Sequence, residues 1–189
     1  MKKIKIDDTI YDANLDFRNI IKCNQIAEDG TIGDFERVLG IIETIFGDKG
    51  IDNPRHYEKL FKWAYKYISM GNEPSNDKPD FDLVEDKKYI VSSFKYDYKY
   101  NPYDLDYLSW EDFYNDLANL SNSEFGNCCI LSRVRQIRNF DVSKIKDEKE
   151  KREIIKAKKQ VALKKYNKPK LTEQQRKSVE HFWKSLERS

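Results

Sequence analysis

The sequence has few of the residues on which catalytic and metal sites are built. Its 189 residues include seven glycines, three cysteines and two histidines. Most of the glycines stand where helices are expected to end, so neither a phosphate-binding loop nor a dinucleotide-binding fingerprint can be written. His56 and His181 have no second ligand at metal spacing, and no serine lies in a nucleophile elbow. We therefore expect no cofactor, no metal site and no enzymatic activity.

Cysteine pairs and long apolar runs are also missing. The cysteines, Cys23, Cys128 and Cys129, form no disulfide framework, because their number is odd and two of them are neighbours. A reducing compartment is the simplest explanation. No uncharged apolar run approaches the roughly 18 residues of a membrane helix, and no apolar segment of a signal peptide follows the first lysines. These absences predict a soluble cytoplasmic protein that does not enter membranes.

Charge is abundant and unevenly distributed. Charged residues make up 36% of the chain and apolar residues 39%, which favours thin helical bundles with wide solvated faces. Residues 142–189 hold 16 Lys and Arg against 7 Asp and Glu, a local charge of +9, so a total of +2 leaves −7 for residues 1–141. The basic end is a candidate for binding an acidic partner. A solvated lysine-rich helix explains the same composition equally well.

The apolar pattern predicts a mainly α fold. A small N-terminal β-hairpin is expected first, followed by a helical bundle and an extended C-terminal helical arm. We expect a hairpin and three helices in residues 1–71, a linker in 72–80, a second helical module in 81–140 and the basic arm in 141–189. The linker contains two prolines and no apolar residue, a composition that is also typical of a long loop within one domain.

The clearest predicted helix follows Thr31, its expected N-cap, and ends at Gly47. Gly30 is expected to end the preceding helix in a left-handed conformation. Ser109 should cap a later helix, and residues 123–138 should form another, with Ile130, Val134 and Ile137 facing inward. The stripe expected to form the core of the clearest helix comprises Phe35, Val38, Leu39, Ile42, Ile45 and Phe46.

Two apolar stripes carry candidate partner contacts. Trp110 and Phe113 are expected to anchor the second module to the first, with partner binding as the alternative. The last predicted helix either docks back onto the body of the protein or binds a partner or a second copy of the chain. Its stripe comprises Val179, Phe182, Trp183 and Leu186.

The basic arm supplies the other candidate site residues. Lys158 and Lys159 are expected to attract an acidic partner. Asp141, Ser143 and Lys144 lie in a charged segment interpreted as a hinge, in which Asp141 or Ser143 caps the next helix. Nucleic acid is disfavoured as a partner, because arginine is scarce in the arm, glutamates interrupt the lysines and no recognised reader motif is present.

Three segments, in their order along the chain, resemble one known protein family. The segments are Tyr89-Ile90 with Phe94 behind it, Leu108-Ser109-Trp110 followed by Phe113, and Asp141-x-Ser143-Lys144-Ile145-Lys146. This order resembles the gene-product-fifteen-like family of siphophages that infect Gram-positive bacteria. Members of that family look like tail assembly chaperones.

The resemblance implies a non-enzymatic phage protein in the cytoplasm of the bacterial host, absent from the mature virion. Such a chaperone would coat the long helical tape measure protein, keep it soluble and help to recruit the tail tube protein. The resemblance also implies self-association. The main alternative is a structural virion component, such as a head–tail connector or minor tail protein, and a DNA-binding regulator ranks third.

Overall fold

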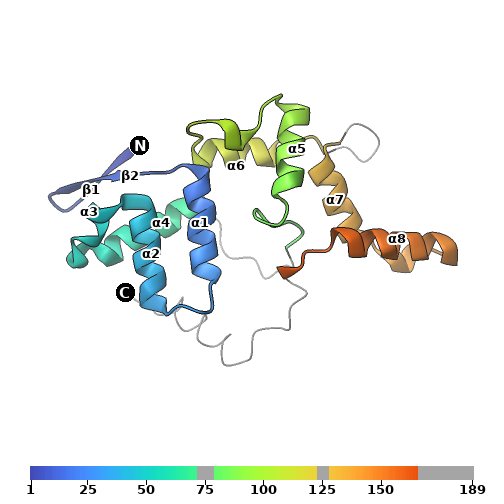
Figure 1. Ribbon diagram of the computed structural model, residues 1–189, viewed down its shortest axis with the longest axis horizontal. Helices are drawn as coiled ribbons and strands as arrows, with labels where there is room; N and C mark the ends of the chain where they lie inside the picture. Colours follow the sequence, from blue (N-terminus) through green and yellow to red (C-terminus); the bar gives the residue numbers. More distant parts are fainter. Residues whose placement is uncertain (72–78, 123–127, 166–189) are drawn as a thin grey trace. The chain divides into compact units, whose positions relative to one another are not determined.

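The computed structural model describes residues 1–71, 79–122 and 128–165, which belong to two compact units. Of these residues, 1–71 and 109–111 belong to the first unit and the others to the second. The described residues are mainly helical and begin with a two-stranded β-hairpin (Figure 1). The predicted fold class, mainly α with an N-terminal hairpin, is therefore confirmed.

The hairpin joins strands β1 (Lys2–Ile6) and β2 (Thr9–Ala13), which pair antiparallel. Side chains alternate between the two faces of a strand. Ile4 therefore shares the buried face with Tyr11, its partner across the hairpin. Asp7 begins the turn with a φ of 52°, a left-handed conformation that aspartate tolerates better than most residues. The hairpin lies at the N-terminal end of the chain, as predicted.

Helix α2 is central to the first unit, because it contacts α1, α3, α4 and strand β2. Its buried residues, Ile41, Ile42, Ile45 and Phe46, recur at the spacing of a helix that buries one face. Gly47 follows it with a φ of 63°, as predicted for the glycine that ends this helix. The helices of the unit are α1 (Phe17–Glu28), α2 (Asp34–Phe46), α3 (Asp48–Ile51), a 3-10 turn (Pro54–His56) and α4 (Tyr57–Ile68).

The start of α2 differs from the prediction. Thr31 does not cap the helix; its backbone N–H and hydroxyl both donate to the Asp29 carboxylate, which forms a local turn. The helix begins three residues later, after Gly33. Phe35 then falls in the first turn, where its side chain is 63% exposed, so its assignment to the core is wrong. Gly30 does not adopt the left-handed conformation either, since α1 ends at Glu28 with Asp29 as its C-cap.

The second unit is built on the packing of α5 against α7, and α7 also contacts α8 (Figure 1). In its core, the ring of Phe94 stacks on that of Phe113 with centroids 5.5 Å apart. Helix α6 begins directly after Ser109, as predicted. The helices are α5 (Lys87–Asp97), a 3-10 turn (Pro102–Asp104), α6 (Trp110–Ala118, of which the second unit holds the residues from Asp112 on), α7 (Ile130–Asn139), a second 3-10 turn (Val142–Lys144) and α8 (Glu148–Val161).

In helix α7, one residue that was predicted to face inward is exposed. Ile130 is the first residue of the helix and is 43% exposed, while the next residue, Leu131, is buried together with Val134. The stripe was therefore predicted one position out of phase at its start. Residues 123–127, which the prediction included in this helix, lie outside the described residues. None of the helices that the structure describes is long and apolar enough to cross a membrane.

Candidate partner-binding site

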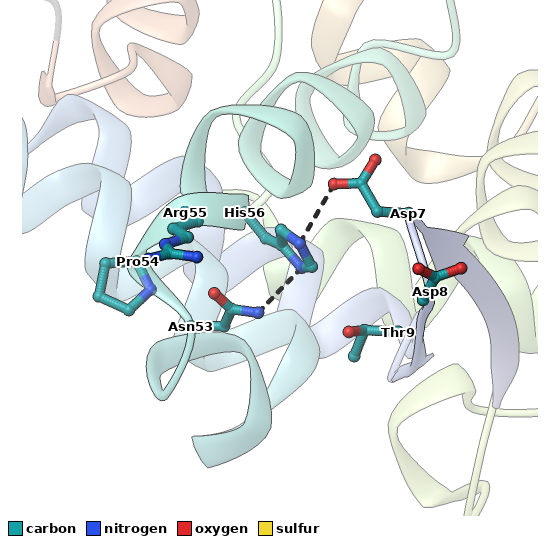
Figure 2. Close-up of a pocket in the computed structure, with 7 residues that line it drawn as sticks. All are labelled: Asp7, Asp8, Thr9, Asn53, Pro54, Arg55 and His56. Atoms are coloured by element: carbon teal, nitrogen blue, oxygen red, sulfur yellow. Dashed lines mark hydrogen bonds and ion pairs between the residues drawn. The ribbon is translucent and has the colours of Figure 1, made fainter.

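Two hollows in the described structure hold polar side chains, one in each unit. The first is an open pocket of about 500 Å³ beside the hairpin turn (Figure 2). His56 enters it from the 3-10 turn before α4, and the turn residues Asp7 and Asp8 lie on the other side. The proline at the first position of that turn is a favoured helix start and places His56 one turn later.

Both ring nitrogens of His56 are engaged. Nδ1 lies 2.7 Å from the Tyr11 hydroxyl and 3.2 Å from Asn53 Nδ2, while Nε2 lies 3.2 Å from the Asp7 carboxylate. When the proton is on Nε2, which faces the Asp7 carboxylate, the single lone pair of Nδ1 can be shared by the Tyr11 hydroxyl and the Asn53 amide. Figure 2 shows the contacts with Asn53 and Asp7.

This polar cluster fastens the hairpin to α4. Lys59 of α4 places its Nζ 2.6 Å from the Asp7 carboxylate, and this hydrogen bond holds the pKa of Asp7 below its ordinary value. Because the histidine nitrogens are satisfied by protein groups and Tyr11 is fully buried, the cluster presents no activated nucleophile. Its arrangement therefore supports the fold.

The described residues offer little else for catalysis or metal binding. Among them, no three His, Cys, Asp or Glu side chains are grouped so that they could hold a metal ion. Burial raises the pKa of the Cys23 thiol to about 12, so this cysteine stays protonated at neutral pH and is a poor nucleophile.

The second hollow is a groove of about 460 Å³ in the second unit, between the end of α7, the turn after it and α8. We call it the α8 groove. Apolar and charged side chains both line it, as is common in binding sites. The lining residues are Pro79, Asp80, Arg138, Asn139, Val142, Ile155, Lys158, Lys159, Ala162 and Leu163.

Helix α8 buries none of its fourteen residues, although it contacts α7. Its N-terminus is capped by Asp147, whose carboxylate accepts a hydrogen bond from the Glu150 N–H at 2.8 Å. At the other end, Arg138 Nε donates to the carbonyl oxygen of Val161 at 2.6 Å. A cation at a helix C-terminus also interacts favourably with the helix dipole. The helix is thus held at both ends while most of its surface stays accessible.

Arg138 joins three segments of the second unit. It forms a two-pronged ion pair with Asp86, with N–O distances of 2.6 and 2.7 Å, and also donates to the Asp80 carbonyl oxygen. Asp86 is 1% exposed, and a buried carboxylate needs such a partner. Its hydrogen bond to Asp86 raises the pKa of Arg138 further above its ordinary value, so the guanidinium stays charged.

The chain after α8 is fixed to the segment just before α5. The Glu85 carboxylate accepts hydrogen bonds from the backbone N–H groups of Lys164 and Lys165 at 2.7 and 2.6 Å. Asp82 lies 3.3 Å from Lys165 Nζ. Partial burial acts to raise the pKa of Asp82, but backbone hydrogen bonds and the nearby lysine outweigh it and lower the pKa overall. These contacts hold the end of α8 beside the groove.

The predicted site residues fall into three groups. Lys158 and Lys159 both line the α8 groove, where Lys158 Nζ donates to the Phe140 carbonyl oxygen at 2.6 Å. Trp110 and Phe113 are 4% and 0% exposed, so our proposal does not use them as partner contacts. The last group, Val179, Phe182, Trp183 and Leu186, lies outside the described residues.

The segment predicted to be a hinge forms a capped 3-10 turn. Asp141 is its N-cap, accepting hydrogen bonds from the backbone N–H and the hydroxyl of Ser143, and Lys144 is its last residue. The hinge role stays a prediction. Sequence reasoning missed Arg138 and Val142 as groove residues, because each owes its position to segments that are distant in the sequence. Only Val142, an apolar residue within this charged segment, gave a local signal.

A family model described as Bacteriophage Gp15 protein matches residues 1–163. The chain belongs to this phage protein family. Every residue that lines the α8 groove lies within the matched range, as does the polar cluster around His56. No curated protein and no solved structure gave a significant match. The phage part of the resemblance is therefore confirmed, and the part concerning tail assembly belongs to the proposal below.

Proposed function

We propose that this chain is a tail assembly chaperone that binds the tape measure protein. The observation that carries the proposal is the family match over residues 1–163. The geometry supports it, because α8 buries none of its own residues and stands beside a groove with apolar and basic walls. Helix-in-groove recognition uses surfaces of this kind.

In this role, the chain acts by binding and carries out no reaction. It covers apolar stripes of the long helical tape measure protein in the host cytoplasm and so prevents their aggregation. It then helps to recruit tail tube subunits, which displace it as the tube grows, and it is absent from the mature virion. Self-association of several copies would let one tape measure protein be covered along its length.

Co-expression tests the proposal. The full chain, carrying an affinity tag, is produced together with the tape measure protein encoded near it, and the purified material is passed over a sizing column. We expect the two proteins to elute together. A chain that elutes alone, beside an insoluble tape measure protein, would contradict the proposal.

A structural component of the virion is the second candidate, since membership of a phage protein family is equally compatible with it. Mass spectrometry of purified phage particles separates the two roles. A chaperone should be missing from the particles, whereas a connector or minor tail protein should be present in a fixed number of copies.

A further inference from the structure

The α8 groove combines an apolar surface with an unbalanced positive charge. Val142, Ile155 and Leu163 contribute apolar side chains from the turn after α7, from α8 and from the chain beyond it. Ile155 is half-buried within the protein, which leaves part of its surface for a ligand. A groove of about 460 Å³ has room for a few side chains of a partner.

The negative charges in the groove are already compensated. The Asp80 carboxylate lies 3.0 Å from Arg135 Nε and also accepts a hydrogen bond from Asn139. The positive charge of Arg138, which also lines the groove, is balanced by the buried carboxylate of Asp86. These groups therefore contribute little net charge to the groove.

Neither groove lysine forms an ion pair with a carboxylate among the described residues, although Asp141 lies close enough to interact electrostatically with Lys158. Lys158 donates to a backbone carbonyl oxygen, which carries no formal charge, and Lys159 forms no ion pair among the described residues. Residues 148–165 hold eight Lys and Arg against three Asp and Glu, a local charge of +5. A ligand that brings carboxylates would complement this surface.

We propose that the α8 groove binds an acidic amphipathic helix of the client protein. One apolar side chain of that helix would contact Val142 and Ile155 above the buried Leu163, and a carboxylate one turn away would pair with Lys159. This assignment rests on the proposed chaperone function for the identity of the client, the tape measure protein. The charge complementarity itself comes from the groove alone.

Charge reversal on α8 tests this site with a matched control. Lys159→Glu changes a groove lysine, whereas Lys156→Glu makes the same change on the same helix at an exposed position outside the groove. Binding of the purified full-length variants to the tape measure protein is measured by titration, and circular dichroism checks that each is folded. We expect Lys159→Glu to weaken binding at least tenfold and Lys156→Glu less than threefold.

A second variant removes the apolar part of the site without changing its charge. Ile155→Ser should weaken binding at least fivefold while the helical circular dichroism signal is retained. Equal losses from Lys159→Glu and Lys156→Glu would show that α8 attracts acidic partners by its overall charge, which would overturn the groove proposal.

A designed probe separates the groove from the chaperone function. The probe is a fluorescent helical peptide with leucines on one face and glutamates beside them, and its control carries lysines in place of the glutamates. Binding of the acidic peptide alone, weakened by Lys159→Glu but not by Lys156→Glu, supports the groove even if the tape measure protein fails to bind. Tape measure binding that resists Lys159→Glu would overturn the groove but leave the chaperone function. The groove proposal would also be overturned if the chain bound duplex DNA but not the peptide, and if both variants weakened DNA binding equally.

Discussion

Gly50 lies where any larger residue would collide with α2. A Cβ atom added there would be 2.7 Å from the Cβ of Phe46 and 2.9 Å from a methyl group of Ile42. We expect Gly50→Ala to lower the free energy of unfolding by about 1–3 kcal/mol, the usual cost of overpacking. Gly30→Ala is the control, because an added Cβ there meets no atom within 4 Å. Chemical denaturation measures both, and equal effects would contradict the tight contact between α3 and α2.

The Tyr11 hydroxyl is the buried partner of His56. Tyr11→Phe keeps the ring but removes this hydrogen bond, so we expect the free energy of unfolding to fall by about 1 kcal/mol. Tyr96→Phe, at a side chain that is half exposed, should change it by less than about 0.5 kcal/mol. Thermal or urea unfolding of the two variants gives the comparison. A loss from Tyr11→Phe no greater than that from Tyr96→Phe would show that the hydrogen bond to His56 does not stabilise the fold.

Asp7 makes the attachment of the hairpin sensitive to acid. Its pKa is lowered in the folded protein by Lys59, so the ionised form stabilises the fold above the ordinary aspartate pKa, about 3.9. This contribution is lost as the pH falls through the lowered pKa. Urea unfolding should therefore show the wild type more stable than Asp7→Asn near pH 6, with the advantage shrinking below about pH 4. A difference that is constant with pH would contradict this role of the Asp7 charge.

At the scale of elements, α8 depends on Arg138. Arg138→Leu would leave Asp86 buried without its partner, so we expect the second unit to lose about 3–5 kcal/mol of stability. The Val161 carbonyl would lose its hydrogen bond as well, so amide exchange in α8 should become faster. Hydrogen exchange followed by mass spectrometry measures this.

The double variant Asp86→Asn with Arg138→Leu is the control for that experiment. It removes the buried charge along with its partner, so part of the lost stability should return. If Arg138→Leu leaves both the stability of the second unit and exchange in α8 unchanged, the ion pair does not hold this helix in place.

Periodicity predicted the elements whose signals are local. The stripe through Ile42, Ile45 and Phe46 and the glycine after it indicated both the core face and the end of α2. The predicted start of α2 was wrong because Thr31 forms a local turn by hydrogen bonding to Asp29, and the spacing of apolar residues does not predict such a turn. Helix starts are set by such local hydrogen bonds, and neighbouring polar residues offer several of them.

Contacts across the sequence could not be predicted in this way. Tyr11 and His56 are 45 positions apart, and Asp86 and Arg138 are 52 apart. Nothing in the sequence around these residues distinguishes them from polar residues on an ordinary surface. The lysines of the α8 groove were found from composition, whereas its walls depend on how α7, the turn after it and α8 pack together.

At the scale of the whole molecule, charge is the feature that distinguishes the two ends of the chain. Residues 142–189 carry +9 and the rest −7. If the basic end attracts an acidic client, salt should weaken the complex, because ions screen charges separated by more than about 10 Å at ~0.1 M. We expect the dissociation constant of the complex with the tape measure protein to rise at least threefold between ~50 and ~300 mM salt. Affinity that is independent of salt would show that apolar contacts alone hold the client.

We propose that this member of the Gp15 family keeps the tape measure protein soluble. The soluble fraction of the tape measure protein, produced alone or together with the wild-type chain, tests this proposal. We predict that most of the tape measure protein is insoluble alone and soluble in company, in a complex that contains this chain. The same soluble fraction in both cases, with no complex, would contradict the claim.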